Sequence, residues 1–146
     1  MKRHVIESVL VLLTGATLGL GMYTFVYAKG YSYLSNNPAA CANCHVMGEY
    51  YGAWMKGPHR NAATCNDCHT PHDLVGKYVT KASNGFAHSL AFTLGGFPDA
   101  IAIKDRSRRV TENACRNCHG SIVDAIEGSH SRELSCIRCH ADAGHM

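Results

Sequence analysis

The chain has 146 residues, of which 8 are cysteine and 10 are histidine, and its formal net charge at pH 7 is only +3. So small an excess of positive charge gives no case for a nucleic-acid-binding protein. The sequence also contains no glycine-rich nucleotide loop and no Ser/His/Asp pattern, so the cysteines and histidines are the groups left to carry chemistry.

The N-terminal residues have the pattern of a membrane anchor. Lys2 and Arg3 precede an almost uninterrupted apolar run over residues 5–28, which is long enough to cross the hydrocarbon core of a bilayer as one helix. A cleaved signal peptide is the alternative, because residues 26–28 resemble a small-residue cleavage site, but the run is longer than a typical signal core. We therefore expect an uncleaved anchor whose basic end lies in the cytoplasm.

A short connector follows the anchor. Four tyrosines cluster at and just after the end of the apolar run, where aromatic residues favour the membrane boundary: Tyr23, Tyr27, Tyr31 and Tyr33. The connector should therefore hold the first cysteine motif just outside the membrane.

Four copies of one motif follow. In C-x-x-C-H, two thiols add covalently to the vinyl groups of a haem, and the histidine is placed to meet the iron. The copies span residues 41–45, 65–69, 115–119 and 136–140. Together they use every cysteine of the chain: Cys41, Cys44, Cys65, Cys68, Cys115, Cys118, Cys136 and Cys139.

Zinc sites and disulfide frameworks also use paired cysteines, but neither explains a histidine directly after the second cysteine in all four copies. The motifs therefore predict four covalently attached c-type haems. About 118 residues follow the anchor, too few to wrap four porphyrins in a thick protein core. We expect a mainly α fold with little regular structure, in which one N-terminal transmembrane helix carries a compact head with the haems as its core.

These observations predict three parts: a cytoplasmic tail at residues 1–4, a transmembrane anchor at 5–28 and a periplasmic tetrahaem cytochrome c domain at 29–146. Within the last part, the insert at residues 70–114 separates the second and third motifs. Val75, Val79, Ala82 and Phe86 recur in it at helical spacing, so they share a face that must be buried or laid against lipid.

The opposite face of the same predicted helix is polar, with Lys77, Lys81, Asn84 and His88 within about 60° of one another. Such a stripe is usually a solvated face. Here an apolar stretch at residues 90–97 follows it, too short to span a bilayer but suited to lie in its surface or against a haem. The stripe could therefore line a pocket for an amphiphilic ligand.

Each low-spin haem takes two axial ligands, and the motif histidines supply at most one each. His59 and His145 lie in short segments rich in polar or small residues, and we interpret both as iron ligands. His72 follows His69 too closely to reach the far face of the same haem, so we interpret it as a hydrogen-bonding residue. The role of His130 stays open.

Met47 stands two residues after the first motif histidine, where a methionine is ordinarily a packing residue, but its thioether is also a soft iron ligand. The anchor, the four motifs, the extension of the first motif to C-x-x-C-H-x-M, the run Cys65–His72 and the long insert resemble the NapC/NirT family of membrane tetrahaem quinol dehydrogenases. The short form and the C-terminal residues 139–146 are most similar to the small membrane subunit of cytochrome c nitrite reductase complexes.

The resemblance implies that Met47, rather than His45, binds the iron of haem 1 beside a quinol pocket. The lysine of that pocket corresponds to Lys81. Members can carry an aspartate at the position of His88, so whether His88 ligates haem 1, accepts a quinol proton or does both is left open.

The resemblance also implies ligands for the other haems: His69 with His145 for haem 2, and His119 with His59 for haem 3. For haem 4, His140 is the near ligand, and the distal ligand comes either from a lysine of the catalytic partner or from His130.

The function implied is oxidation of menaquinol or another quinol and transfer of its electrons to a periplasmic multihaem nitrite reductase catalytic subunit, in respiratory nitrite ammonification. The chain would then be an electron-transfer subunit of the inner membrane, in contact with lipid, rather than the nitrite-reducing subunit. Alternatives are a quinol dehydrogenase that feeds a different periplasmic reductase, a haem enzyme that itself reduces a small nitrogen oxide, and a soluble shuttle released after Ala28.

Overall fold

The computed structural model describes residues 2–98, 100–128 and 135–145. The chain divides into two compact units, an anchor unit (residues 1–32) and a head unit (residues 33–146). Every regular element of the described residues is helical, which confirms the mainly α prediction. Outside three longer helices, no described element exceeds nine residues.

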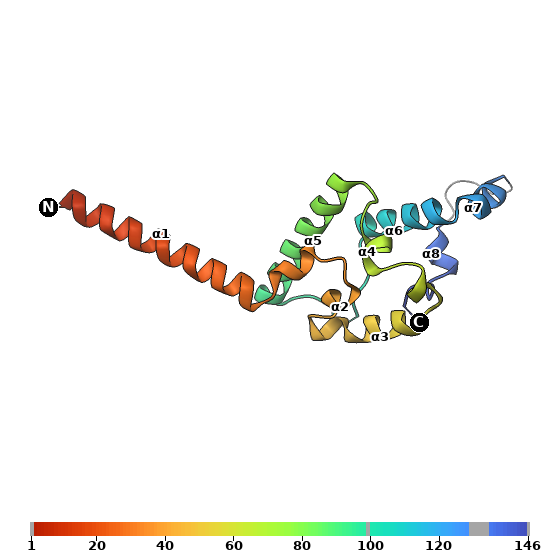
Figure 1. The fold of residues 1–146 in the computed structure, drawn as a ribbon, viewed down its shortest axis with the longest axis horizontal. Coiled ribbons are helices and arrows are strands. Elements are labelled where there is room, and N and C mark those ends of the chain that lie inside the picture. The colour runs from red at the N-terminus through yellow and green to blue at the C-terminus, as the bar shows by residue number, and fades with distance from the viewer. Residues whose placement is uncertain (1, 99, 129–134, 146) are drawn as a thin grey trace. The chain divides into compact units, whose positions relative to one another are not determined.

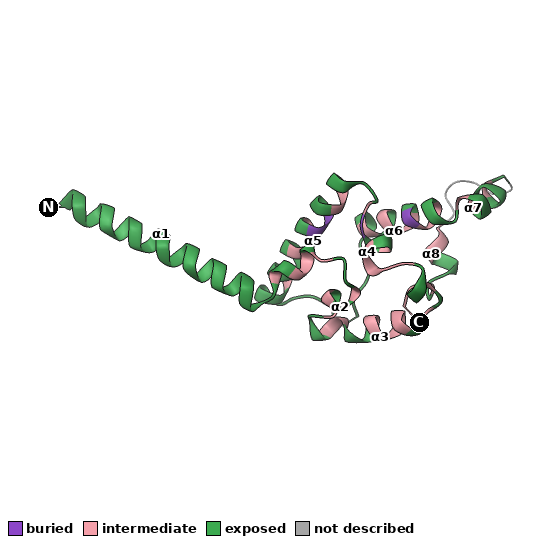
Figure 2. Cartoon of the chain, in the orientation of Figure 1, coloured by how far each residue is buried: buried purple, intermediate pink, exposed green. Residues whose placement is uncertain are grey.

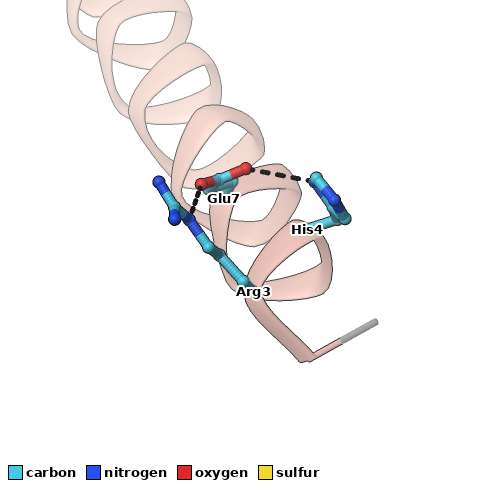
Figure 3. A network of polar contacts seen from close by, with 3 residues as sticks. All are labelled: Arg3, His4 and Glu7. Atoms are coloured by element: carbon cyan, nitrogen blue, oxygen red, sulfur yellow. Dashed lines mark hydrogen bonds and ion pairs between the residues drawn. The ribbon is translucent and has the colours of Figure 1, made fainter.

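The anchor unit is built on α1 (Lys2–Tyr27), the first helix in Figure 1. It is long and apolar enough to cross a membrane, with a mean hydropathy of 1.9. The charged residues lie in its first two turns, where Glu7 pairs with Arg3 at 2.9 Å and with His4 at 3.4 Å (Figure 3). All the charged residues of the helix thus lie near its N-terminal end, so about 20 apolar residues remain to match a bilayer core.

The other elements follow in chain order: η1 (Gly30–Leu34), α2 (Pro38–Cys41), η2 (His45–Met47), α3 (Gly48–Lys56), η3 (Pro58–Asn61), α4 (Cys65–His69), α5 (Leu74–Leu94), α6 (Asp105–Cys118), α7 (Gly120–Glu127) and α8 (Cys136–Cys139). The cysteine motifs lie on or at the ends of α2, α4, α6 and α8. In the head unit α2 contacts α4, α4 contacts α6, and α6 contacts α8. The motif helices therefore form a row in the order of the sequence (Figure 1).

The side chains of the head unit form almost no apolar core. Among the described residues, Ala114 is the only apolar residue that is buried, and the buried polar residues are Thr70, Thr80 and Lys81. Figure 2 accordingly shows burial only in short patches. A domain of this size normally buries more than half of the surface of its unfolded chain. The burial pattern fits a head whose apolar interior is supplied by prosthetic groups.

The helix predicted in the insert is present as α5. It is longer than the predicted apolar and polar faces, which together cover residues 75–88. Asp73 caps its first turn by accepting a hydrogen bond from the backbone of Gly76 at 2.6 Å. The helix runs on through Leu94 and ends at Gly95 and Gly96, whose φ angles of 72° and 82° lie in the left-handed region that glycine adopts without strain. Part of the apolar stretch at residues 90–97 thus belongs to the helix.

A carboxylate from α6 holds the start of the fourth motif. Glu112 accepts hydrogen bonds from the Ser135 hydroxyl and from the backbone N–H groups of Cys136, at 2.8 Å, and Ile137, at 3.3 Å. Burial acts to raise the pKa of Glu112, but these hydrogen bonds outweigh it and lower the pKa below that of an ordinary glutamate. The ionised carboxylate therefore stabilises the contact between α6 and α8.

Replacing Glu112 with alanine should lower the free energy of unfolding by about 1–3 kcal/mol, because partly buried donors lose their acceptor. The difference in unfolding free energy between the wild type and the variant should be greatest above the pKa of an ordinary glutamate. It should disappear as the pH falls through the lowered pKa of Glu112, where the carboxylate becomes protonated. Urea unfolding followed by haem absorbance measures it. Glu49→Ala, at an exposed position of α3, is the control, and equal losses in the two variants would contradict the capping role.

Candidate functional site

The thiols of successive motifs lie next to each other. All eight cysteines are outside disulfides. Cys41 and Cys65 share a side-chain hydrogen bond, which lowers the pKa of Cys41 to about 7 and raises that of Cys65. Burial is the first cause of the raised pKa of Cys68, followed by the neighbouring thiol of Cys115. The pKa of Cys136 is likewise raised by burial, by Glu112 and by Cys115.

The fold thus brings motif 1 beside motif 2, motif 2 beside motif 3, and motif 3 beside motif 4. Groups attached to these cysteines would form a continuous series, as a chain of electron carriers requires.

Two pairs of histidine rings lie close together across long sequence separations, His69 with His145 at an interplanar angle of 28° and His59 with His119 at 89°. The ring centroids of His69 and His145 are 5.9 Å apart, and those of His59 and His119 are 6.1 Å apart. Two imidazoles on opposite sides of one metal ion would have centroids roughly 6 Å apart, since each N–metal bond is about 2 Å long. The spacing in each pair therefore fits two imidazoles on one iron, and these are the pairs that the family resemblance implies; that they ligate haems 2 and 3 stays a prediction.

The hydrogen bonds of His59 and His145 define which ring nitrogen is available. The Nδ1 atom of His59 lies 2.8 Å from the carbonyl oxygen of Ala143, and that of His145 lies 3.1 Å from the carbonyl oxygen of Tyr50. A carbonyl oxygen only accepts, so Nδ1 carries the proton in both rings. The neutral ring then keeps its lone pair on Nε2, as in histidines that bind metals.

His72 has a different environment. Its Nε2 atom lies 3.0 Å from the carbonyl oxygen of Asp67, and its Nδ1 atom lies 3.2 Å from the amide nitrogen of Asn117. Nε2–H therefore donates and Nδ1 accepts, which occupies both nitrogens. The contacts agree with the prediction that His72 is a hydrogen-bonding residue.

None of the other described ligand candidates lies in such a pair of histidine rings. His45 and Met47 lie on η2, where His45 is exposed and Met47 is half-buried. His140 is exposed at the end of α8. His130 lies outside the described residues.

Lys81 is buried in the polar face of α5, with only 6% of its surface exposed, although such a stripe is usually solvated. Its Nζ atom donates to the carbonyl oxygen of Ser35 at 2.8 Å and to Oδ1 of Asn36 at 3.1 Å, and it lies 5.8 Å from the centroid of the Tyr78 ring. Among the described residues no carboxylate forms an ion pair with it. Burial, and then the charge of Lys77, lower the pKa of Lys81, so the amine releases its proton more readily than an exposed lysine.

His88 lies two helical turns beyond Lys81 on the same face of α5. Its Nδ1 atom is 3.1 Å from the hydroxyl oxygen of Tyr33. The Tyr33 ring lies against α5 at Gly85, where a Cβ atom would come within 3.3 Å of the ring. The segment Tyr33–Asn36 thus contacts both candidate pocket residues.

The contacts of Lys81 and His88 with the segment Tyr33–Asn36 lie close to the first motif. Burial raises the pKa of Tyr33, and the nearby thiols of Cys44 and Cys41 raise it further. Lys81 and Cys41 are near enough to influence each other's pKa. Lys81 and Tyr33 therefore lie beside the cysteines of the first motif.

Several residues of this site were not evident from the sequence. Tyr33 was expected only as a membrane-boundary aromatic, and Ser35 and Asn36 carried no signal. Asn66 shares their oxygens with Lys81, at 3.3 Å and 3.2 Å, and so connects motif 2 to the same segment. These contacts join residues more than 29 positions apart, and no local pattern could have indicated them.

The model of the NapC/NirT cytochrome c family, N-terminal region, matches residues 1–146. The chain belongs to this family. It is 39% identical over 141 residues to the cytochrome c-type protein NrfH of Wolinella succinogenes, with 88% of this chain and 79% of the relative covered. It is 32% identical over 136 residues to the cytochrome c nitrite reductase subunit NrfH of Nitratidesulfovibrio vulgaris, with 93% and 83% covered.

The structure also resembles a solved chain in the crystal structure of the cytochrome c nitrite reductase NrfHA complex bound to the inhibitor HQNO. The TM-score is 0.67 at 29% identity, and the match covers 93% of this chain and 90% of that chain. Family membership shows that the motif cysteines bind c-type haem. Together with α1, it also shows a membrane protein with a single span.

The number of haems can be measured on the cysteines themselves. A haem attached through both thioethers leaves neither thiol of its motif free to react, so denatured holoprotein should incorporate no alkylating reagent, as measured by intact mass. Protein made without haem attachment is the control and should take up a label on all eight thiols. Two labels on the holoprotein would show that one motif carries no haem.

Proposed function

We propose that this chain is a membrane-bound tetrahaem cytochrome c that oxidises menaquinol or another quinol and passes the electrons to a periplasmic cytochrome c nitrite reductase catalytic subunit. The observation that carries the proposal is the likeness, over nearly the whole of both chains, to a chain of the NrfHA complex. Two NrfH relatives more than 30% identical support it. The head lies in the periplasm, because the basic residues precede α1 and haem is attached to c-type motifs on that side.

We assign the axial ligands as the family resemblance implies, and the ring spacings support two of the four haems. His69 and His145 hold haem 2, and His119 and His59 hold haem 3, since each pair has the ring spacing of two imidazoles on one iron. Met47 is the ligand of haem 1, and His140 is the near ligand of haem 4. The distal ligand of haem 4 comes from His130 or from a lysine of the catalytic partner.

When bound, the haems supply one-electron oxidation and reduction, and the quinol is the source of electrons and protons. The chain's own residues must then bind the quinol hydroxyl and receive its protons. Lys81 suits the task because its amine is buried and hydrogen-bonded only to neutral oxygens in the described structure. We assign His88 to proton acceptance, because it lies on the same face of α5 as Lys81 and its Nδ1 atom is 3.1 Å from the Tyr33 hydroxyl oxygen.

Replacing Lys81 with leucine should abolish haem reduction by quinol while all four haems stay attached. The loss follows because leucine cannot bind the quinol hydroxyl or exchange a proton. The measurement is anaerobic mixing of the detergent-solubilised protein with a reduced naphthoquinol, followed by haem absorbance, with dithionite giving the total reducible haem. Lys56→Leu, at an exposed position of α3, should react as the wild type does.

Retained quinol oxidation in Lys81→Leu would remove Lys81 from the site. Failure of the wild type to be reduced by the quinol, with haems that dithionite still reduces, would contradict quinol oxidation by this chain alone.

The variants His145→Ala and His59→Ala should each lack one axial ligand. In each variant one low-spin haem should become high-spin, and electron paramagnetic resonance counts the haems in each form. His72→Gln is the matched control, because both nitrogens of His72 already bind the chain and its loss takes no ligand from an iron. An unchanged spectrum in His145→Ala or His59→Ala would contradict that residue's assignment.

A further inference from the structure

His88, His59 and His145 share one feature: the Nδ1 atom of each ring lies within hydrogen-bond distance of an oxygen of the chain. For His59 and His145 the oxygen is a backbone carbonyl, which fixes the proton on Nδ1. For His88 it is the hydroxyl of Tyr33, 55 positions away in the sequence. The sequence offers no local reason for this tyrosine to meet that histidine.

The position of Tyr33 is defined by packing as well as by the hydrogen bond. Its ring lies on Gly85, with three ring atoms 3.3–3.4 Å from where a Cβ atom would stand. Gly85 lies between Lys81 and His88 on the same face of α5, four residues after the first and three before the second. The absence of a side chain there lets the ring approach the helix and its hydroxyl reach His88.

The same short segment also holds Lys81. Ser35 and Asn36 accept both hydrogen bonds of the amine, and Asn66 donates to the same two oxygens. The segment Tyr33–Asn36 therefore sets the positions of both groups that the proposed function assigns to the quinol. Tyr33 is the member of the segment that acts on His88.

We propose that Tyr33 is a positioning residue of the quinol site: its hydroxyl oxygen accepts the Nδ1–H of His88 and leaves Nε2 as the nitrogen that receives a quinol hydroxyl proton. The inference rests on the proposed function and deepens it. In the step, the quinol O–H bond breaks and an N–H bond forms at Nε2. The electron that leaves with this proton would be taken up by a bound c-type haem, and His88, then an imidazolium, returns the proton to solvent. A second step of the same kind removes the other proton and electron and yields the quinone.

The proton is gained and lost at Nε2, so Nδ1 keeps its hydrogen in both the neutral and the protonated ring. The hydroxyl oxygen of Tyr33 can therefore accept from Nδ1–H in both states. The hydrogen bond therefore orients the ring through the whole cycle of gaining and losing a proton. Removing the oxygen leaves the ring packing on Gly85 in place but leaves Nδ1 without its partner.

The test is Tyr33→Phe in the detergent-solubilised holoprotein, mixed anaerobically with reduced naphthoquinol at several concentrations. The maximal rate of haem reduction should fall on the order of 10-fold, as for removal of a partner that orients a functional histidine, with the quinol concentration for half-maximal rate unchanged. Haem content and reduction by dithionite should equal those of the wild type. Tyr31→Phe, on the same 3₁₀ helix and exposed, is the matched control.

A double-mutant cycle shows whether Tyr33 acts through His88. In a His88→Ala background, Tyr33→Phe should cause no further loss of rate. Gly85→Ala gives a second variant that keeps the hydroxyl but displaces the ring, and it should also lower the maximal rate.

A Tyr33→Phe variant as fast as the wild type overturns the inference and leaves the proposed function standing. The inference is also overturned if Tyr33→Phe lowers the rate by the same factor in the His88→Ala background as in the wild type. A His88→Ala variant whose haem spectrum shows the loss of an iron ligand overturns it as well. A wild-type protein that the quinol does not reduce overturns the proposed function instead, which keeps the two failures distinct.

Discussion

The head unit depends on one constraint, the attachment of large apolar groups to short helical segments. A chain with a single buried apolar residue among those described has no apolar interior of its own to offset the entropy lost on folding. Covalently bound porphyrins supply apolar surface that the side chains do not. Short helices are sufficient under this constraint, because a motif helix has only to place cysteines for attachment and need not bury an apolar face of its own.

The order of the motif helices has a functional meaning. Because α2 meets α4, α4 meets α6 and α6 meets α8, groups bound to consecutive motifs are neighbours. Electrons pass between two carriers when the carriers lie close together, and the protein need not supply reacting groups for that step. The polypeptide contributes mainly at the two ends of such a series, where it must select an electron donor and an acceptor. In the proposed function, the polar face of α5 beside motif 1 is where the quinol would give up its electrons. Lys81 and His88 on this face lie within hydrogen-bond distance of the segment Tyr33–Asn36.

The histidines show how their surroundings determine their roles. His59 and His145 donate through Nδ1 to carbonyls, so Nε2 keeps its lone pair for a metal. His72 uses both nitrogens within the chain. His88 is paired with a hydroxyl, whose donor and acceptor roles can exchange. Four residues of one type therefore have three different environments, and each environment indicates a different chemistry.

The sequence by itself determined the groups that are strongly patterned: the apolar helix, the C-x-x-C-H motifs, the mainly α class and the two faces of α5. Motif spacing is local, and covalent chemistry leaves few alternatives, so these features need no tertiary information. The pairings His69 with His145 and His59 with His119 came from a family resemblance, and the ring spacings agree with them.

Only the tertiary structure revealed the burial of Lys81, the contact of Tyr33 with His88, and the hold of Glu112 on the fourth motif. Each joins residues from distant parts of the chain and depends on how short helices pack around groups that the amino-acid pattern does not place. The physical reason is that hydrogen bonds of this kind form between surfaces brought together by folding, so no periodicity within either segment records them.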